Sequence, residues 1–323
     1  MILSSSLPAT RPHQASAAAL PAGDGPAPEP DQPPFARVAL EKVCGTVQAF
    51  TKVPASFLPC LVAGVAHGVS GGMDEKRLAR LLDIASGVQV AVGLTLALGT
   101  QGNMLQTFLT KGVLGGLGAY IVSRGGTNLK LAQDLAAHKP EGSLLERAFQ
   151  GAGHGVRTAV VDGIAVGYSE GRGDAAGLWE GGQMLPAVLK EGENPQGWGA
   201  RLAGGATGAL LVPGAVVDGL SMALGQGKLA SPWLLGASSV AVAACLGALV
   251  LGAPAAAVGA GVALLASLKG AKSAHERVEA SVEKLNQAGQ DLGDPVANKH
   301  REFVGAMVVG GAAGARAGYQ SWS

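Results

Sequence analysis

The chain has 323 residues and a formal net charge of +1, with 24 basic and 23 acidic side chains. Apolar residues make up 48% of it, but only 4% are aromatic, 15% are charged and 51 residues are glycine. The even charge balance, with no basic run interleaved with aromatic residues, argues against nucleic-acid binding, and a charged fraction below the roughly 25% of soluble domains indicates surroundings poor in water.

The first 35 residues are rich in Ser, Pro and Ala. They lack the basic region and following apolar run that mark a Sec signal peptide. We expect a disordered tail here, and a targeting or secretion segment of another kind remains the alternative. A single helical domain, residues 36–323, is expected to follow.

The first half of that domain contains several helical patterns. Val38, Val43 and Val47 recur at helical spacing, and two uncharged runs follow at residues 53–73 and 84–110. After a polar stretch, Ser143 precedes Glu146 by three residues, which predicts a capping box at the start of a new helix.

The most distinctive segment is an uncharged run of 40 residues, 229–268. A membrane-spanning helix needs about 20 apolar residues, so this length, with Gly252-Ala253-Pro254 near its middle, predicts a membrane-like helical hairpin at 232–268. Trp233 at one end and Lys269 just beyond the other suit a membrane interface. An ordinary amphipathic helix is expected at about 271–292, with Val278, Val282 and Leu285 as its apolar stripe.

Glycines recur four residues apart in three clusters. Residues at this spacing lie on one helix face, and three glycines there form a groove against which another backbone can lie closely. The pattern resembles glycine-zipper membrane segments, a packing style that implies no activity. The predicted helix-packing residues are Gly64, Gly68, Gly72, Gly163, Gly167, Gly171, Gly310, Gly314 and Gly318.

These strings also suggest an internal repeat. Related six-residue strings begin at Gly151, Gly204, Ala257 and Gly310, 53 residues apart each time, and a further copy begins at Gly64. About 53 residues suffice for two helices and a connection. The expected fold is therefore all-α: a Gly/Ala-rich bundle of many helices with glycine-zipper packing and a repeat of about 53 residues.

Four polar residues are candidates for function. His67 and His154 occupy the same place in two copies of the glycine string, and Asp162 and Asp218 each follow an Ala-Val-Val sequence. An acidic residue inside a membrane helix is a functional hypothesis. The simpler interpretation, which we favour for all four, places them near helix ends at the water boundary.

No motif indicates catalysis. The sequence has no HExxH or GxSxG motif, no complete phosphate loop and no Cys-His cluster. The three cysteines are far apart, which is typical of small buried side chains rather than a metal site. We therefore expect a protein that is not an enzyme and has no metal or cofactor.

The leading functional hypothesis is a membrane-inserted or membrane-associated helical protein that acts as a self-associating scaffold or pore. Its partners would be membrane lipid and further copies of itself, with no nucleic acid. The alternative is a soluble, secreted or cytoplasmic helical effector that keeps the hairpin buried. A small-molecule transporter that uses Asp162 and Asp218 is a third hypothesis.

Overall fold

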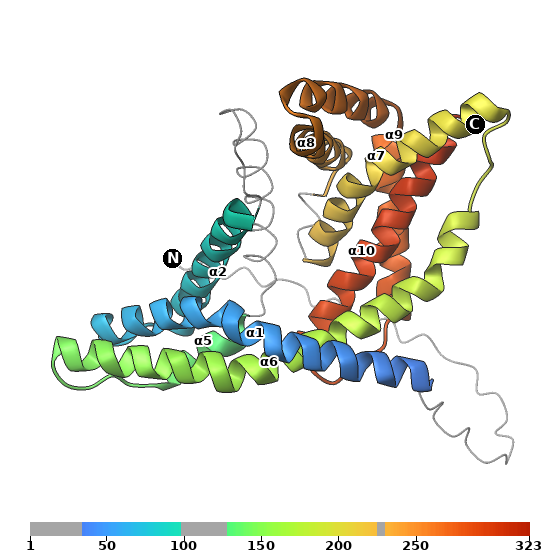
Figure 1. Cartoon of the computed structure of the whole chain (residues 1–323). Helices are drawn as coiled ribbons and strands as arrows, with labels where there is room; N and C mark the ends of the chain where they lie inside the picture. Colours follow the sequence, from blue (N-terminus) through green and yellow to red (C-terminus); the bar gives the residue numbers. More distant parts are fainter. Residues whose placement is uncertain (1–33, 98–127, 225–229) are drawn as a thin grey trace, which may run out of the picture. The chain divides into compact units, whose positions relative to one another are not determined.

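A computed structural model of the chain describes residues 34–97, 128–224 and 230–323 (Figure 1). The expected all-α fold is confirmed, because the described residues form eight α-helices and no strand. The predicted N-terminal tail, apart from Pro34 and Phe35, and much of the 84–110 run lie outside the described residues. The helices are α1 (Phe35–Ser70), α2 (Glu75–Ala97), α5 (Asn128–Ala137), α6 (Leu144–Lys190), α7 (Trp198–Ala223), α8 (Pro232–Leu251), α9 (Ala253–Ala288) and α10 (Pro295–Gln320).

Helix starts follow the local sequence closely. The predicted capping box is confirmed: the Ser143 hydroxyl accepts from the Glu146 backbone N–H, and the Glu146 carboxylate accepts from the Ser143 N–H. Ser231 and Asp294 cap α8 and α10 in the same sense, and a proline follows each of them. A proline at the first helical position costs nothing, because its missing N–H would have no partner in the helix.

The 229–268 segment contains all of α8 and the first part of α9. Gly252 separates the two helices with a φ of +87°, a conformation that residues with a side chain rarely adopt. The expectation of a separate helix at about 271–292 is wrong, since α9 continues without a break to Ala288. No proline lies between 268 and 271, and Gly270 stays within the helix rather than ending it.

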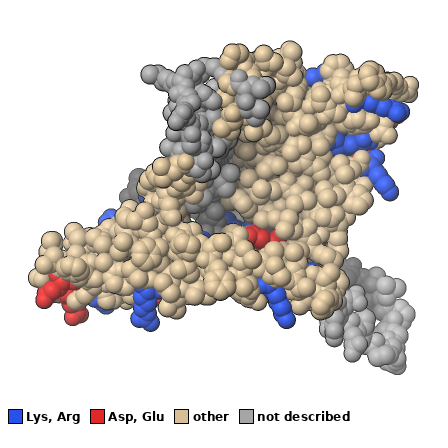
Figure 2. Space-filling view, in the orientation of Figure 1, with Lys and Arg blue, Asp and Glu red and all other residues tan. Residues whose placement is uncertain are grey.

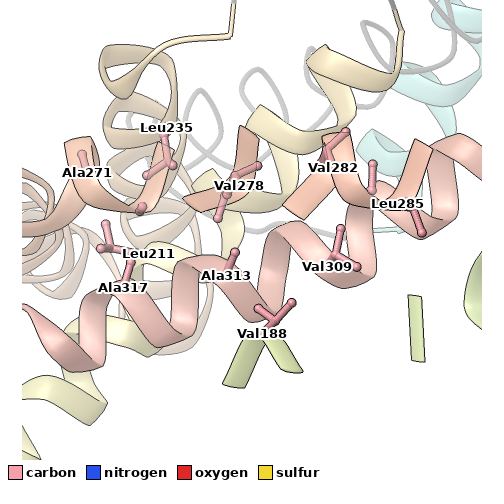
Figure 3. Packing of buried hydrophobic residues seen from close by; sticks show 13 residues of the cluster. Val188, Leu211, Leu235, Ala271, Val278, Val282, Leu285, Val309, Ala313 and Ala317 are labelled. Carbon is pink, nitrogen blue, oxygen red and sulfur yellow. The ribbon is translucent and has the colours of Figure 1, made fainter. Parts of the chain in front are cut away.

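Two hydrophobic cores hold the helices together. One joins α1, α2, α5 and α6 around Leu78, Leu82, Leu131 and Leu135. The other joins the five helices α6, α7, α8, α9 and α10. It includes the predicted apolar stripe of α9, formed by Val278, Val282 and Leu285, which is buried against α10 (Figure 3). Both cores depend on alanine and valine as much as on leucine, so helices approach closely at many points.

Helix α6 belongs to both halves of this arrangement. It is 47 residues long, and its first part packs antiparallel to α1, with Gly155 against Cys60 and Gly171 against Cys44. Its later part packs parallel to α10, with Gly177 against Arg301. One continuous helix therefore presents successive glycines to two different partners.

Candidate functional site

The α1–α6 contact is formed largely by glycine. A Cβ added to Gly64 would overlap the Gly151 carbonyl of α6, and one added to Gly68 would overlap that of Arg147. On α6, a Cβ at Gly167 would lie 2.6 Å from the Gln48 carbonyl oxygen, and one at Gly171 would lie 2.6 Å from the Gly45 Cα. Backbones therefore touch with no room for a side chain.

Gly163 has more room than its neighbours on α6. An added Cβ would lie 3.0 Å from the Ser56 hydroxyl oxygen and 3.9 Å from the Val53 Cα. The Ser56 hydroxyl donates to the Lys52 carbonyl oxygen within α1. The α1–α6 contact therefore has room for the Ser56 side chain opposite Gly163, whereas backbone atoms of α1 lie directly against the neighbouring glycines of α6.

The α7–α10 contact has the same character. A Cβ at Gly310 would lie 2.9 Å from the Ala215 carbonyl oxygen, and one at Gly318 would lie 2.5 Å from the Gly208 Cα. A Cβ at Gly314 would overlap that of Ala215. The predicted C-terminal cluster thus lies against a helix about 100 residues earlier in the chain, between α7 residues 207 and 219.

Gly72 is a correction to the predicted packing set. Helix α1 ends at Ser70, and Gly71 caps it in the left-handed conformation with a φ of +73°. Gly72 follows with a φ of +123°, and a Cβ there would meet nothing within 4 Å. Its glycine serves the turn after the helix rather than helix packing.

His67 and His154 come together in a cluster with His138. The rings of His138 and His154 stack with centroids 4.6 Å apart, and His67 Nε2 lies 2.7 Å from the His138 carbonyl oxygen. The Met73 backbone N–H donates to His67 Nδ1 at 2.9 Å, so both ring nitrogens of His67 have a backbone partner. This histidine cluster joins the ends of α1 and α5 to α6.

Within the histidine cluster, His138 is the ring for which protonation is disfavoured. The Nε2 atom of His138 is buried and has no hydrogen-bond partner among the described residues. Burial, followed by the proximity of His154 and His67, lowers the pKa of His138 below its ordinary value of 6.5. His67 lies in the last turn of α1, as expected, whereas His154 lies well inside α6, so the helix-end interpretation is wrong for His154.

Asp162 is a second correction, because it lies in the middle of α6 rather than at a helix end. Burial raises the pKa of its carboxyl group, and Asp134 of α5 raises it further through its charge and a hydrogen bond, while Arg157 opposes them. Asp134 also accepts from the Thr158 hydroxyl at 2.6 Å. Asp162 therefore belongs to a pair of carboxyl groups at the α5–α6 contact.

Asp218 lies five residues before the end of α7 and is completely buried. One carboxylate oxygen lies 2.7 Å from His275 Nδ1 of α9, and the other accepts the Ser231 backbone N–H at 3.0 Å. Ser231 is the residue that caps α8. Asp218 of α7 thus links its own helix to α8 and α9, and its contacts with the described residues are structural.

A polar network at the crossing of α1, α6 and α10 was not found from the sequence. Lys52 Nζ lies 2.6 Å from the Glu170 carboxylate, and His300 Nδ1 lies 2.8 Å from that of Asp174. Gln48 donates to Asp174 at 2.9 Å. Glu170 and Asp174 flank Arg172, and His300 lies between Lys299 and Arg301, so each stretch is an ordinary polar one in the sequence. Only the fold brings residues 52, 170 and 300 together.

The outer apolar face of the α8–α9 hairpin bears directly on the hypothesis of a membrane-like hairpin. The two helices meet through small residues, with Gly247 against the Ala255 carbonyl and Gly259 against that of Ala243. Larger apolar side chains point outward, and uncharged side chains cover most of the face seen in Figure 2. The outer apolar face consists of Trp233, Leu246, Val258, Val262, Leu264, Leu265 and Leu268.

This arrangement inverts the usual order of a protein in water. An apolar side chain such as Leu or Val gains roughly 1.5–3 kcal/mol on burial, yet those of the outer apolar face stay exposed while alanines fill the contact. Within the described ranges, four helices are by length and composition able to cross a membrane: the segments Phe35–Ser70, Trp198–Ala223, Pro232–Leu249 and Pro254–Ala288.

The described residues contain no group of three or more His, Cys, Asp or Glu placed to hold a metal ion. Of the cysteines, Cys60 and Cys245 are buried and Cys44 is half-buried, and none of the three forms a disulfide. The chemistry that the structure does bring together consists of the histidine cluster, the Asp218–His275 pair and the polar network.

Comparison with known proteins adds no assignment: no family model, curated protein or solved structure matches this chain.

Proposed function

We propose that this chain is a non-enzymatic, membrane-associated helical protein that inserts its α8–α9 hairpin into a lipid bilayer. The observation that carries the proposal is the outer apolar face, where leucine and valine point outward and glycine and alanine point inward. In a bilayer the outward side chains meet lipid, and the close helix contact supplies the packing that holds the pair together.

The same observation argues against the soluble alternative, in which the hairpin is buried. In the described structure its larger side chains are exposed, and the segments Pro232–Leu249 and Pro254–Ala288 are buried only in part. Self-association as a scaffold or pore would use these outward surfaces. The glycines at the α1–α6 and α7–α10 contacts are already covered by helices of the same chain.

The test compares two exposed apolar residues of nearly equal exposure. Val258 on the outer apolar face is 66% exposed, and Leu145 in the first turn of α6, outside the candidate spans, is 65% exposed. Replacing a valine by aspartate costs about 3–4 kcal/mol of insertion free energy at the centre of a membrane helix, and this is an upper bound for Val258, which lies near the start of α9. We therefore expect Val258→Asp to move the protein out of floated liposomes and out of the carbonate-resistant pellet.

Leu145→Asp is the matched control. It places a carboxylate at a helix N-terminus, where the helix dipole favours it, and we expect it to float with liposomes like the unmodified protein. A wild-type protein that remains in the supernatant after carbonate treatment overturns the proposal and favours the soluble alternative. Equal flotation of both variants overturns the role given to the hairpin.

A further inference from the structure

A cavity of about 550 Å³ lies where the polar network meets α2 and α5. This volume is within the range of about 300–1,000 Å³ that is typical of small-molecule sites. Helices α1, α2, α5, α6 and α10 all contribute to its lining, as does Leu224 at the end of α7. The cavity shares none of its lining with the α8–α9 hairpin on which the proposed function rests.

The charges along the cavity favour an anion. Among the described lining residues are Lys52, Lys299 and His300 and one carboxylate, that of Glu170, while Asp174, outside the lining, lies 2.8 Å from His300. Glu170 is already held by Lys52 at 2.6 Å and lies 3.7 Å from His300 Nε2. Lys299 is half-buried, donates no hydrogen bond to the described residues and forms no ion pair with them, so its charge can meet a ligand.

A second polar group in the lining also lacks a partner. The side-chain oxygen of Gln89 is buried and accepts no hydrogen bond within the described structure, while its amide nitrogen reaches the Pro54 carbonyl oxygen at 3.5 Å. A buried acceptor left without a hydrogen bond is destabilising. A hydroxyl group on the ligand would supply that hydrogen bond.

The remaining walls are apolar. Val90 of α2, Leu224 and Phe303 of α10 line the cavity together with Ala55 of α1. A ligand that fits this lining has an apolar chain, an anionic head for Lys299 and a hydroxyl for Gln89. We propose that the cavity binds a single-chain anionic lipid of this chemistry, a monoacyl glycerophosphate.

The binding experiment uses the full chain in non-ionic detergent and three ligands with the same oleoyl chain. Oleoyl lysophosphatidate has both the charge and the hydroxyl, oleate has the charge alone, and monoolein has hydroxyls alone. We expect saturable binding by native mass spectrometry and calorimetry, strongest for lysophosphatidate. Equal affinity for lysophosphatidate and monoolein would show that the positive lining selects nothing and would overturn the proposal.

Two variants locate the site. Lys299→Met removes the unpaired charge and should weaken lysophosphatidate binding about tenfold or more, because hydrogen bonds to charged groups contribute strongly, while monoolein binding stays unchanged. Ala55→Trp fills the cavity and should abolish binding of all three ligands. Lys42→Met, at an exposed lysine of α1 outside the cavity lining, is the control and should bind like wild type.

If Lys299→Met and Ala55→Trp both bind lysophosphatidate as wild type does, the ligand binds elsewhere and the proposal fails. Absence of saturable binding to the wild-type protein has the same consequence. Because no bilayer is present in this experiment, its failure is independent of the result of liposome flotation.

Discussion

Two glycines that lie two residues apart on α6 provide a sharp test of the backbone contact between α1 and α6. Gly155 is buried, and a Cβ there would overlap the Cys60 carbonyl oxygen and lie 2.9 Å from its carbonyl carbon. Gly153 is exposed, and a Cβ there would meet nothing within 4 Å. Substitution of each glycine by alanine therefore adds the same atom to the same helix in opposite environments.

The expected free energies of unfolding follow directly. Alanine in place of glycine inside a helix stabilises the folded state by about 0.5–1 kcal/mol, so Gly153→Ala should be more stable than wild type by this amount. Gly155→Ala receives the same gain, but the two helices must separate by roughly half an ångström or more, and such overpacking costs typically about 1–3 kcal/mol. The two variants should differ by about 1–3 kcal/mol, since the helix-propensity gain cancels in the difference.

The assay is urea unfolding in mild detergent, followed by circular dichroism at 222 nm with all three proteins at one concentration. Gly155→Ala should have the lower midpoint and Gly153→Ala the higher. If Gly155→Ala is stabilised as much as Gly153→Ala, the carbonyl of Cys60 does not lie against Gly155 in the folded protein, and the argument for glycine-mediated packing fails.

Three further predictions concern the buried polar groups. His138→Phe keeps a ring against His154 but removes a group whose pKa is lowered on folding. Because the unfolded state then binds the proton more readily than the folded state, wild type should lose stability as pH falls below about 6.5, and the variant should lose less. Urea midpoints at pH 7.5 and 5.5 measure the difference. Asp162→Asn removes a carboxyl group whose pKa is raised in the folded state, so that its ionised form destabilises the fold. The variant should therefore be more stable than wild type at pH 7.5, and this difference in stability should shrink as pH falls through the acidic range. An equal difference at pH 4 would contradict this. Asp218→Ala leaves His275 and the Ser231 N–H without their buried partner and should cost about 3 kcal/mol of unfolding free energy, whereas unaltered stability would show that Asp218 does not fasten the helices.

Much of the fold could be predicted from local sequence. The all-α class follows from the helical spacing of small apolar residues, and the capping box at Ser143 and Glu146 is a signal contained in four residues. The break at Gly252 also follows, because a glycine with a proline two residues later ends a helix and allows another to begin. These features depend on neighbours in the chain.

The sites depend on residues far apart in the chain and could not be predicted in the same way. Lys52, Glu170 and His300 meet only because α6 contacts α1 with one part and α10 with another. Asp162 was misplaced for a related reason. A carboxyl group inside an apolar stretch suggests a helix end. Asp162 lies inside a helix instead, because its partner carboxyl group, that of Asp134, comes from a separate helix that the sequence does not place beside it.

The inward position of glycine and alanine has a consequence for how this protein tolerates mutation. In a water-soluble domain, the large apolar residues are the positions where change is least accepted. Here the outward leucines and valines of α9 should exchange freely for one another in lipid, while adding a single methyl group at Gly155 or Gly171 should be damaging. A deep mutational scan would thus show the strongest loss of stability at buried glycines and little effect at the large outward side chains, the reverse of the pattern in a water-soluble domain.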